Sequence, residues 1–286
     1  MIKSLLMILC LVAIAMAGPV RGAEKRPMTI QDLFKFKRVS DPQVSPDGKW
    51  IVYSVTDVDL DKNSTSSRIW LVSSDGGGPK ALTNTPDKKD HSPRWAPDSK
   101  HLVFVSNRNE GSQLWVININ GGEARQLTSI STGASSPVWS PDGKHLAFVS
   151  TVYPEFSSKP FKKSDELNKK KDEEKEKNPV KAKVHTKLFY RHWDSYVNDK
   201  RQHLFVVSFN DGKAGEPKDV TPGDRDAMPN SGTFSSGQDF TFSPDGKFLV
   251  FTASPEKDEA WNTNFDICRV PITGGTKKWE TLTSNK

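Results

Sequence analysis

The chain has 286 residues, of which 34% are hydrophobic, and it carries 19 Gly, 19 Pro, 2 Cys and a net charge of +6. Two cysteines exclude a disulfide-stapled scaffold and a zinc site built from cysteine alone. With 15 Phe and 8 Trp, the chain holds too much large apolar surface for a wholly disordered protein. The basic charge suggests nucleic acid or an anionic membrane as a partner, and its distribution along the chain tests that suggestion.

Residues 1–17 read as a secretory signal peptide, with cleavage as late as Ala23 as a variant. Lys3 precedes an apolar run that is shorter than the roughly 20 residues needed to span a bilayer, and the run ends in Ala-Met-Ala. We therefore expect a secreted or periplasmic protein without stable membrane insertion; an uncleaved membrane anchor is the less favoured alternative. Cleavage would leave Cys268 alone, in an apolar strand pattern typical of a buried small hydrophobe.

Residues 29–36 (TIQDLFKF) predict a short helix at the start of the mature chain. Thr29 can cap it, and Asp32 three residues later completes a capping-box arrangement. Its expected apolar stripe consists of Ile30, Leu33 and Phe34.

A Pro-Asp turn followed by an apolar β-branched and aromatic run occurs four times, at residues 45–49, 96–100, 140–144 and 243–247. Proline fixes φ, aspartate bonds nearby backbone, and the glycine that usually follows allows the chain to leave the turn. The runs are apolar on both faces, which predicts strands buried on both sides. The four turn aspartates are therefore interpreted as turn formers, and His101 and His145 as strand-start packing residues rather than ligands.

Each turn is preceded by a short strand and followed by a second apolar strand, a Gly-rich turn and, usually, a Leu-Thr strand end. Four short strands per unit, repeated about every 45 to 50 residues, are the signature of a β-propeller blade. We predict an all-β fold: a partial β-propeller of four blades over residues 28–286. The tryptophans that recur at equivalent positions are expected in the blade core, and these are Trp70 with Trp115 and Trp95 with Trp139.

The long spacing between the third and fourth turns predicts an insertion in the third blade, at about residues 153–200. It contains the lysine-rich run 159–183, with ten Lys and six acidic residues. A mixed-sign run without interleaved aromatic residues is typical of a solvated, mobile surface insertion. Because the basic charge is concentrated there rather than spread over a folded face, nucleic acid is not expected as a partner.

Three stretches resemble the N-terminal propeller of the prolyl oligopeptidase family of serine peptidases, in its secreted dipeptidyl-peptidase V and acylaminoacyl-peptidase-like branch. They are the opening MTIQDLFKFKRVSDPQVSPDGKW, the Pro-Asp-Gly blade series, and VYPE followed by NPVKAK and LFYRHWDSY. The resemblance implies a seven- or eight-bladed propeller that filters peptide substrates by size, followed by an α/β-hydrolase domain with a Ser-Asp-His triad on a G-x-S-x-G elbow.

The chain departs from that pattern because no G-x-S-x-G occurs in it; Ser135 and Ser236 lack the flanking glycines. We therefore expect a chain that stops before the hydrolase domain, and we assign it no catalytic residue, no metal site and no cofactor. The function expected is the substrate-gating portion of a serine exopeptidase that releases dipeptides or acylated residues from peptide N-termini.

One segment breaks the repeat and groups four functional side chains, and we assign it as a candidate substrate-binding site: Arg191, His192, Trp193 and Asp194. Arg191 could hold a substrate carbonyl or carboxylate, and Trp193 could wall a cavity. The competing and favoured interpretation is structural, with Arg191 and Asp194 tying the insertion to the propeller.

Two other functions stay open at this point. A Tol-system-like periplasmic propeller would bind proteins without chemistry, but it is not expected to carry the YRHWD insertion. A standalone piece could pair with further blades or form a homo-oligomer, although an exposed final edge strand argues against a stable piece.

Overall fold

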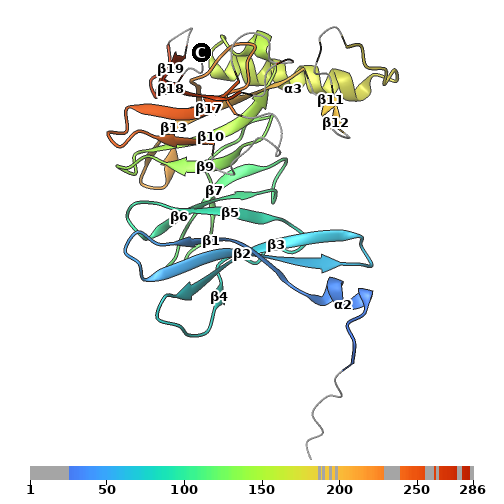
Figure 1. Ribbon diagram of the computed structural model, residues 1–286, viewed down its shortest axis with the longest axis vertical. Coiled ribbons are helices and arrows are strands. Elements are labelled where there is room, and N and C mark those ends of the chain that lie inside the picture. The colour runs from blue at the N-terminus through green and yellow to red at the C-terminus, as the bar shows by residue number, and fades with distance from the viewer. Residues whose placement is uncertain are drawn as a thin grey trace, which may run out of the picture. The chain divides into compact units, whose positions relative to one another are not determined.

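A computed structural model of the protein describes residues 26–185, 188, 191–192, 195–196, 199–228, 239–254, 261, 264–275 and 279–283 (Figure 1). The predicted signal peptide over residues 1–17 lies outside the described residues, as does Ala23. The chain divides into two compact units, residues 1–36 and 37–286.

The described part of the first unit contains one helix, α2 (Ile30–Lys35). The Thr29 backbone N–H donates to the Asp32 carboxylate at 2.9 Å, and the Asp32 N–H donates to the Thr29 carbonyl at 3.0 Å. These bonds confirm the predicted helix and its capping residues. The stripe is largely in solvent, since Ile30 is 67% and Leu33 49% exposed.

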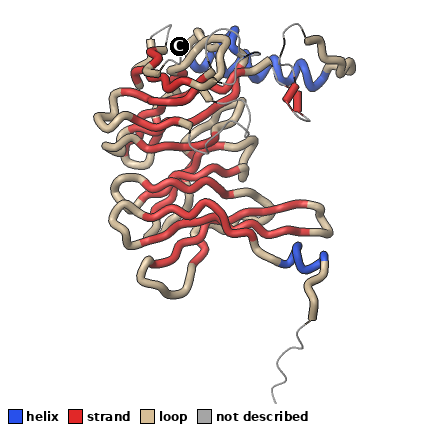
Figure 2. The backbone as a smooth tube through the Cα atoms, in the orientation of Figure 1, coloured by secondary structure: helices blue, strands red, loops and turns tan. Residues whose placement is uncertain are grey.

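In its described residues the second unit contains four larger antiparallel sheets, which form the blades, and one two-stranded hairpin in the insertion (Figures 1 and 2). The first contains β1 (Arg38–Val44), β2 (Trp50–Asp59), β3 (Ser64–Ser73) and β4 (Lys80–Ala81). The second contains β5 (Asp90–Trp95), β6 (His101–Ser106), β7 (Gln113–Asn118) and β8 (Arg125–Gln126). The third contains β9 (Ser135–Trp139), β10 (His145–Val152) and β13 (Arg201–Asn210), with two short outer strands, β14 (Lys213–Ala214) and β15 (Lys218–Asp219). The fourth contains β16 (Phe240–Phe242), β17 (Phe248–Ala253), β18 (Asp266–Pro271) and β19 (Glu280–Thr281). The predicted all-β fold with four propeller blades is confirmed.

The Pro-Asp turns connect the first two strands of each blade through a repeated set of bonds. In the first blade, the Ser45 hydroxyl donates to Asp47 Oδ1 at 2.6 Å and accepts the Trp50 N–H at 3.0 Å. Gly48 leaves the turn at φ 73°, a left-handed conformation that glycine adopts without steric cost. The third and fourth blades repeat the serine–aspartate bonds, at 2.6 Å in both. The interpretation of the aspartates as turn formers is correct.

The second blade has Ala96 where the others have serine, and its aspartate takes over the missing role. Asp98 Oδ1 accepts the His101 N–H directly at 3.0 Å, and Asp98 Oδ2 lies 2.6 Å from His101 Nδ1. His101 and His145 each open a strand, as the repeat predicted.

The threonine of each Leu-Thr or Val-Thr strand end bonds the neighbouring strand. Its hydroxyl accepts a backbone N–H at 2.8 to 3.0 Å in every blade, from Ile69 to Thr83, Leu114 to Thr128, Leu204 to Thr221 and Ile267 to Thr283. The residue before it donates its N–H to the carbonyl of the same partner. At the outer edge of each blade, the threonine side chain therefore accepts a backbone N–H that lies beyond the last regular backbone pair.

Consecutive blades pack face to face through three separate apolar clusters. Alternate residues of β10 show how one strand serves two of them, because Leu146 and Phe148 join the cluster with the second blade while Ala147 and Val149 join the cluster with the fourth. Cys268 is fully buried in that last cluster, as predicted, and burial raises the pKa of its thiol above the usual value.

Candidate functional site

The first strands of three blades share a bulge that turns their polar side chains. Asp41, Ser92 and Ser136 each precede a proline and have φ values of 52°, 54° and 51°. Strand pairing shifts register at the same places. A bulge of this kind bends the strand and redirects the neighbouring side chains. In β1, β5 and β9 it therefore exposes polar groups at positions where a regular strand would continue its backbone hydrogen bonds.

These first strands are linked from blade to blade. Arg94 Nη1 donates to Asp41 Oδ2 at 2.7 Å, and the indole N–H of Trp95 donates to the Gln43 carbonyl at 3.0 Å. The Trp139 indole repeats the second contact one blade later, donating to the Arg94 carbonyl at 3.2 Å. We call the half-exposed polar set on β1 and β5 the inner row, consisting of Asp41, Gln43, His91, Ser92 and Arg94.

The inner row has the chemistry of a binding surface. Asp41 and Arg94 form an ion pair in which each side chain is 27% exposed, so both still reach solvent. His91 Nδ1 lies 3.0 Å from the Ser92 hydroxyl, and burial lowers the pKa of His91 below its usual 6.5. Among the described residues no carboxylate bonds this imidazole, so the pair lacks the orienting third group of a catalytic triad.

The insertion leaves and re-enters the third blade at one point. Val152 ends β10 and pairs with Arg201, the first residue of β13. Between them lie the short helix η1 (Pro154–Phe156), helix α3 (Phe161–Lys177) and a hairpin of β11 (Arg191–His192) and β12 (Ser195–Tyr196). The sequence pattern does not predict a helix here, but residues 161–177 form a 17-residue helix that is largely exposed and packs against the blade through Phe161.

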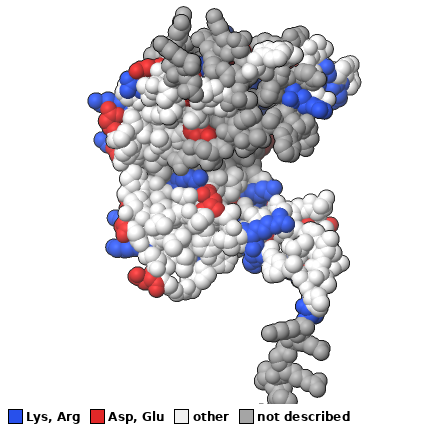
Figure 3. Space-filling model, viewed as in Figure 1, with Lys and Arg blue, Asp and Glu red and all other residues white. Residues whose placement is uncertain are grey.

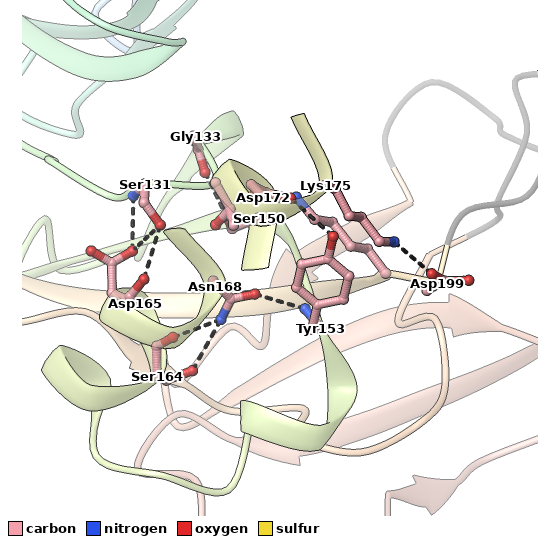
Figure 4. A network of polar contacts seen from close by, with 12 residues as sticks. Ser131, Gly133, Ser150, Tyr153, Ser164, Asp165, Asn168, Asp172, Lys175 and Asp199 are labelled. Atoms are coloured by element: carbon pink, nitrogen blue, oxygen red, sulfur yellow. Dashed lines mark hydrogen bonds and ion pairs between the residues drawn. The ribbon is translucent and has the colours of Figure 1, made fainter. Parts of the chain in front are cut away.

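Tyr153 anchors that helix to the blade (Figure 4). Its backbone N–H donates to Asn168 Oδ1 at 2.8 Å, and its hydroxyl donates to Asp172 Oδ1 at 3.0 Å. Asn168 is only 1% exposed and also donates to the Ser164 carbonyl at 2.8 Å. A buried asparagine with its bonds made fixes the helix in one rotational position.

Three lysines surround the ring of Tyr153. The Nζ atoms of Lys171, Lys200 and Lys175 lie 4.1, 4.9 and 5.0 Å from its centroid, within the range of cation–π attraction. Lys200 also pairs with Asp172 at 2.6 Å. Burial, followed by the hydrogen bond to Asp172, raises the pKa of Tyr153 above 10.0. The lysine-rich run thus holds the insertion in place as well as meeting solvent.

A basic cavity of about 360 Å³ lies at the C-terminal end of α3. It is lined by Lys175, Asn178, residues 180–185 and Asp199. Lys175 pairs with Asp199 at 2.6 Å, and this lysine holds the pKa of Asp199 below its usual 3.8. On the visible face in Figure 3, basic and acidic side chains of the described residues alternate in small groups.

Of the four candidate residues predicted from the sequence, the structure describes Arg191 and His192, which form β11 of the insertion. Arg191 is exposed in β11, and His192 follows it in the same strand. Trp193 and Asp194 lie outside the described residues, so both the substrate-binding role and the structural role of this segment stay predictions. Ser135 opens β9, and Ser236 also lies outside the described residues.

Sequence reasoning missed the inner row, although a signal for it was present. In three blades a second proline stands four residues before the turn proline, at Pro42, Pro93 and Pro137. The residue before each takes the left-handed conformation and forms the bulge.

Within the described ranges, no three His, Cys, Asp or Glu side chains gather as a metal site would require. The described residues also contain no helix with the length and apolar character to cross a membrane.

Comparisons with known proteins identify what the chain resembles. The family model described as TolB beta propeller domain matches residues 30–212. The chain is 29% identical over 280 residues to dipeptidyl-peptidase 5 of Porphyromonas endodontalis, covering 93% of this chain and 38% of that protein. It is 31% identical over 238 residues to the uncharacterized peptidase YuxL of Bacillus subtilis, covering 82% and 33%. The chain thus spans about a third of the length of these relatives.

Solved structures share the fold. The acylaminoacyl peptidase of Pyrococcus horikoshii superposes with a TM-score of 0.57 at 16% identity, covering 88% of this chain and 33% of that one. The predicted resemblance to peptidases of this kind is confirmed at the level of the propeller portion.

Proposed function

Because the chain belongs to the TolB beta propeller domain family, we propose that it is the substrate-facing propeller portion of a secreted or periplasmic peptidase that shortens peptides from their N-termini. The observation that carries this proposal is the similarity to dipeptidyl-peptidase 5, which extends over 93% of the chain. A match of that extent includes the blades and the insertion together. Similarity in the Pro-Asp turn repeat alone would give only short matching segments.

The polypeptide divides, in this proposal, into a signal peptide over residues 1–17 and a propeller over 28–286 with its insertion at about 153–200. Bond cleavage belongs to polypeptide outside this chain, because the chain spans about a third of its relatives and has no G-x-S-x-G sequence. The propeller binds and orients peptide and limits which substrates reach the reacting groups.

The inner row supplies the contacts for a peptide. Arg94 can give guanidinium N–H groups to a carbonyl or a C-terminal carboxylate, and Asp41 can accept from an N-terminal ammonium. Their present pairing at 2.7 Å keeps both groups oriented while each stays partly in solvent. A peptide end would exchange one charge-assisted bond for another, which favours weak and reversible capture. Arg191 and His192 could add contacts from the insertion.

The test uses the intact protein purified from its own source. We expect it to release chromophore from dipeptidyl 4-nitroanilides and to cleave peptides of about ten residues faster than unfolded chains of about one hundred. Arg94→Gln should raise KM for short peptides several-fold while changing kcat little, since it removes binding rather than chemistry. Arg38→Gln, at an exposed position that opens β1 outside the inner row, is the control. Absence of any peptidase activity in a folded, intact protein would overturn the proposal.

The alternative is a propeller that binds proteins and catalyses no reaction. The match to the TolB beta propeller domain family supports this alternative. Such a protein would release no chromophore from any dipeptidyl substrate. The inner row would then serve a protein segment instead of a substrate.

The proposed location has its own test. N-terminal sequencing of the protein recovered outside the cytoplasm should begin at Gly18, or at Glu24 if cleavage follows Ala23. A start at Met1 would contradict the signal peptide and favour the uncleaved anchor.

A further inference from the structure

A cavity of about 370 Å³ lies between the first and second blades, and none of its lining residues belongs to the inner row. Its first wall is the segment that follows β4, and its second wall is β7 with the turn before β8. The lining residues are Leu82, Thr83, Asn84, Thr85, Arg108, Trp115, Ile117, Gly122, Glu123 and Ala124. Its volume is at the lower end of the range in which proteins bind small molecules.

Two donors in this lining have no protein acceptor among the described residues. Trp115 is 8% exposed, and its buried indole N–H makes no hydrogen bond, whereas the indoles of Trp95 and Trp139 each donate to a carbonyl. Arg108 gives Nη2 to Asp90 at 2.9 Å and Nε to Ser106 at 3.0 Å, which leaves Nη1 uncommitted. An unpaired buried donor is costly and indicates an acceptor that is supplied from elsewhere.

Arg108 and Trp115 act as one unit. The guanidinium carbon lies 4.6 Å from the Trp115 ring centroid, and the ion pair with the fully buried Asp90 fixes the arginine in this position. The arginine is therefore preorganised, and a ligand would not have to order a flexible side chain on binding.

The next pair of blades shows what fills this position. Phe205 of the third blade occupies the place of Trp115 in the repeat, and Val152 occupies the place of Arg108. There, Phe161 from the insertion packs edge-on against Phe205, with ring centroids 6.5 Å apart at 76°. An apolar side chain thus closes the interface between the second and third blades, while the corresponding space between the first and second stays open and carries donors.

We propose that this cavity binds a small molecule that carries a carboxylate. The carboxylate accepts from Arg108 Nη1 and the Trp115 indole, while the rest of the ligand lies against the predominantly polar lining. A carboxylate is favoured over a neutral carbonyl because hydrogen bonds between charged partners are about twice as strong. Glu123 on the rim opposes an anion, so we expect dissociation constants on the order of a millimolar for a ligand of about 15 heavy atoms.

The probe is N-acetyl-L-phenylalanine, and its matched control is N-acetyl-L-phenylalaninamide, which has the same shape without the charge. Titration calorimetry on the intact protein should show the acid binding about tenfold more tightly than the amide. Glu123→Gln should tighten binding of the acid several-fold, because it removes the opposing charge. Glu110→Gln, at an exposed position outside the cavity, should leave the affinity unchanged.

A second variant tests the place of binding without disturbing the Arg108–Asp90 pair. Ala124→Trp fills the cavity and should abolish binding, whereas Ala81→Trp on β4 outside the lining should not. Thermal unfolding establishes that both variants are folded. The proposal is overturned if the folded wild type binds neither compound at 10 mM, if acid and amide bind equally, if Glu123→Gln weakens binding, or if Ala124→Trp binds normally. None of these readouts depends on the peptidase assignment.

Discussion

Replacing Thr128 with valine isolates the hydrogen bond that closes the outer edge of the second blade. Thr128 is 2% exposed, and its hydroxyl accepts the Leu114 N–H at 2.9 Å while donating to Gln113 Oε1 at 2.8 Å. Valine has nearly the same shape, so packing is retained and only the polar atom is lost. Gln113 keeps its bonds to the Ile130 N–H and carbonyl, at 3.2 and 2.8 Å.

The magnitude follows from what is left unpaired. A buried N–H without an acceptor costs about 1–3 kcal/mol, and loss of the donated bond adds about 1 kcal/mol. The new methyl group offsets about 0.8 kcal/mol of this. We therefore expect the free energy of unfolding to fall by roughly 1–3 kcal/mol and the melting temperature by roughly 2–12 °C for a chain of this length.

The last blade supplies the matched control. Thr283 accepts the Ile267 N–H at 2.9 Å, but it lies in solvent and Ile267 is 41% exposed. Water replaces the lost acceptor there, so Thr283→Val should cost less than about 0.5 kcal/mol. Urea unfolding followed by circular dichroism measures both, with unchanged m-values as the check on two-state behaviour. Equal losses in the two variants, or a loss below 0.5 kcal/mol at Thr128, would refute the reasoning.

Three further predictions concern the insertion, a turn and the buried thiol. Asn168→Ala leaves the Tyr153 N–H without its acceptor, so trypsin should cut the lysines of α3 about tenfold faster than in wild type; an unchanged rate would contradict the anchoring role. The Ser140 hydroxyl is the main cause that lowers the pKa of Asp142, so Ser140→Ala should raise that pKa toward 3.8 in an NMR titration. A carboxyl group whose pKa is lower in the folded state than in the unfolded state stabilises the fold above the unfolded pKa, and this stabilisation is lost on acidification. The variant lacks part of this stabilisation, so between about pH 5 and 2 its free energy of unfolding should fall less than that of the wild type. Burial raises the pKa of Cys268, so N-ethylmaleimide at pH 7 should modify the native thiol at least ~100-fold more slowly than the urea-unfolded one, as peptide mass spectrometry can measure.

The blades could be predicted because each local signal acts alone. Proline, aspartate and glycine at residues 46–48 set the turn through bonds within five residues of each other, and the structure forms those bonds. The apolar runs that follow are long enough to be buried on both faces. The inner-row bulges were missed because a left-handed φ before proline at Asp41 or Ser92 depends on the register of the paired strand, which a single segment does not specify.

Helix α3 was missed for a different reason. Its sequence lacks an apolar stripe, and the periodic signal that usually reveals a helix is absent. Contacts with other parts of the chain hold the helix, and they include Phe161 on the blade core, Asn168 on Tyr153, and Asp165 on the Ser131 N–H at 2.8 Å. Ion pairs along the helix such as Lys170–Glu174 add only a few tenths of a kcal/mol each. Tertiary contacts of this kind cannot be counted from residue type alone.

The three inter-blade clusters share no residue, and central strands of the second and third blades, such as β6 and β10, divide their side chains between the two clusters that flank them. In such an arrangement the stability of each blade is coupled only to that of the blades packed directly against it. Truncations at Leu71 in the first cluster and at Phe251 in the last should therefore be additive in free energy, while Leu71 and Phe104, which belong to the same cluster, should not. Sequence change in one blade can then accumulate without correlated change two blades away, so that the architecture permits its segments to diverge at independent rates.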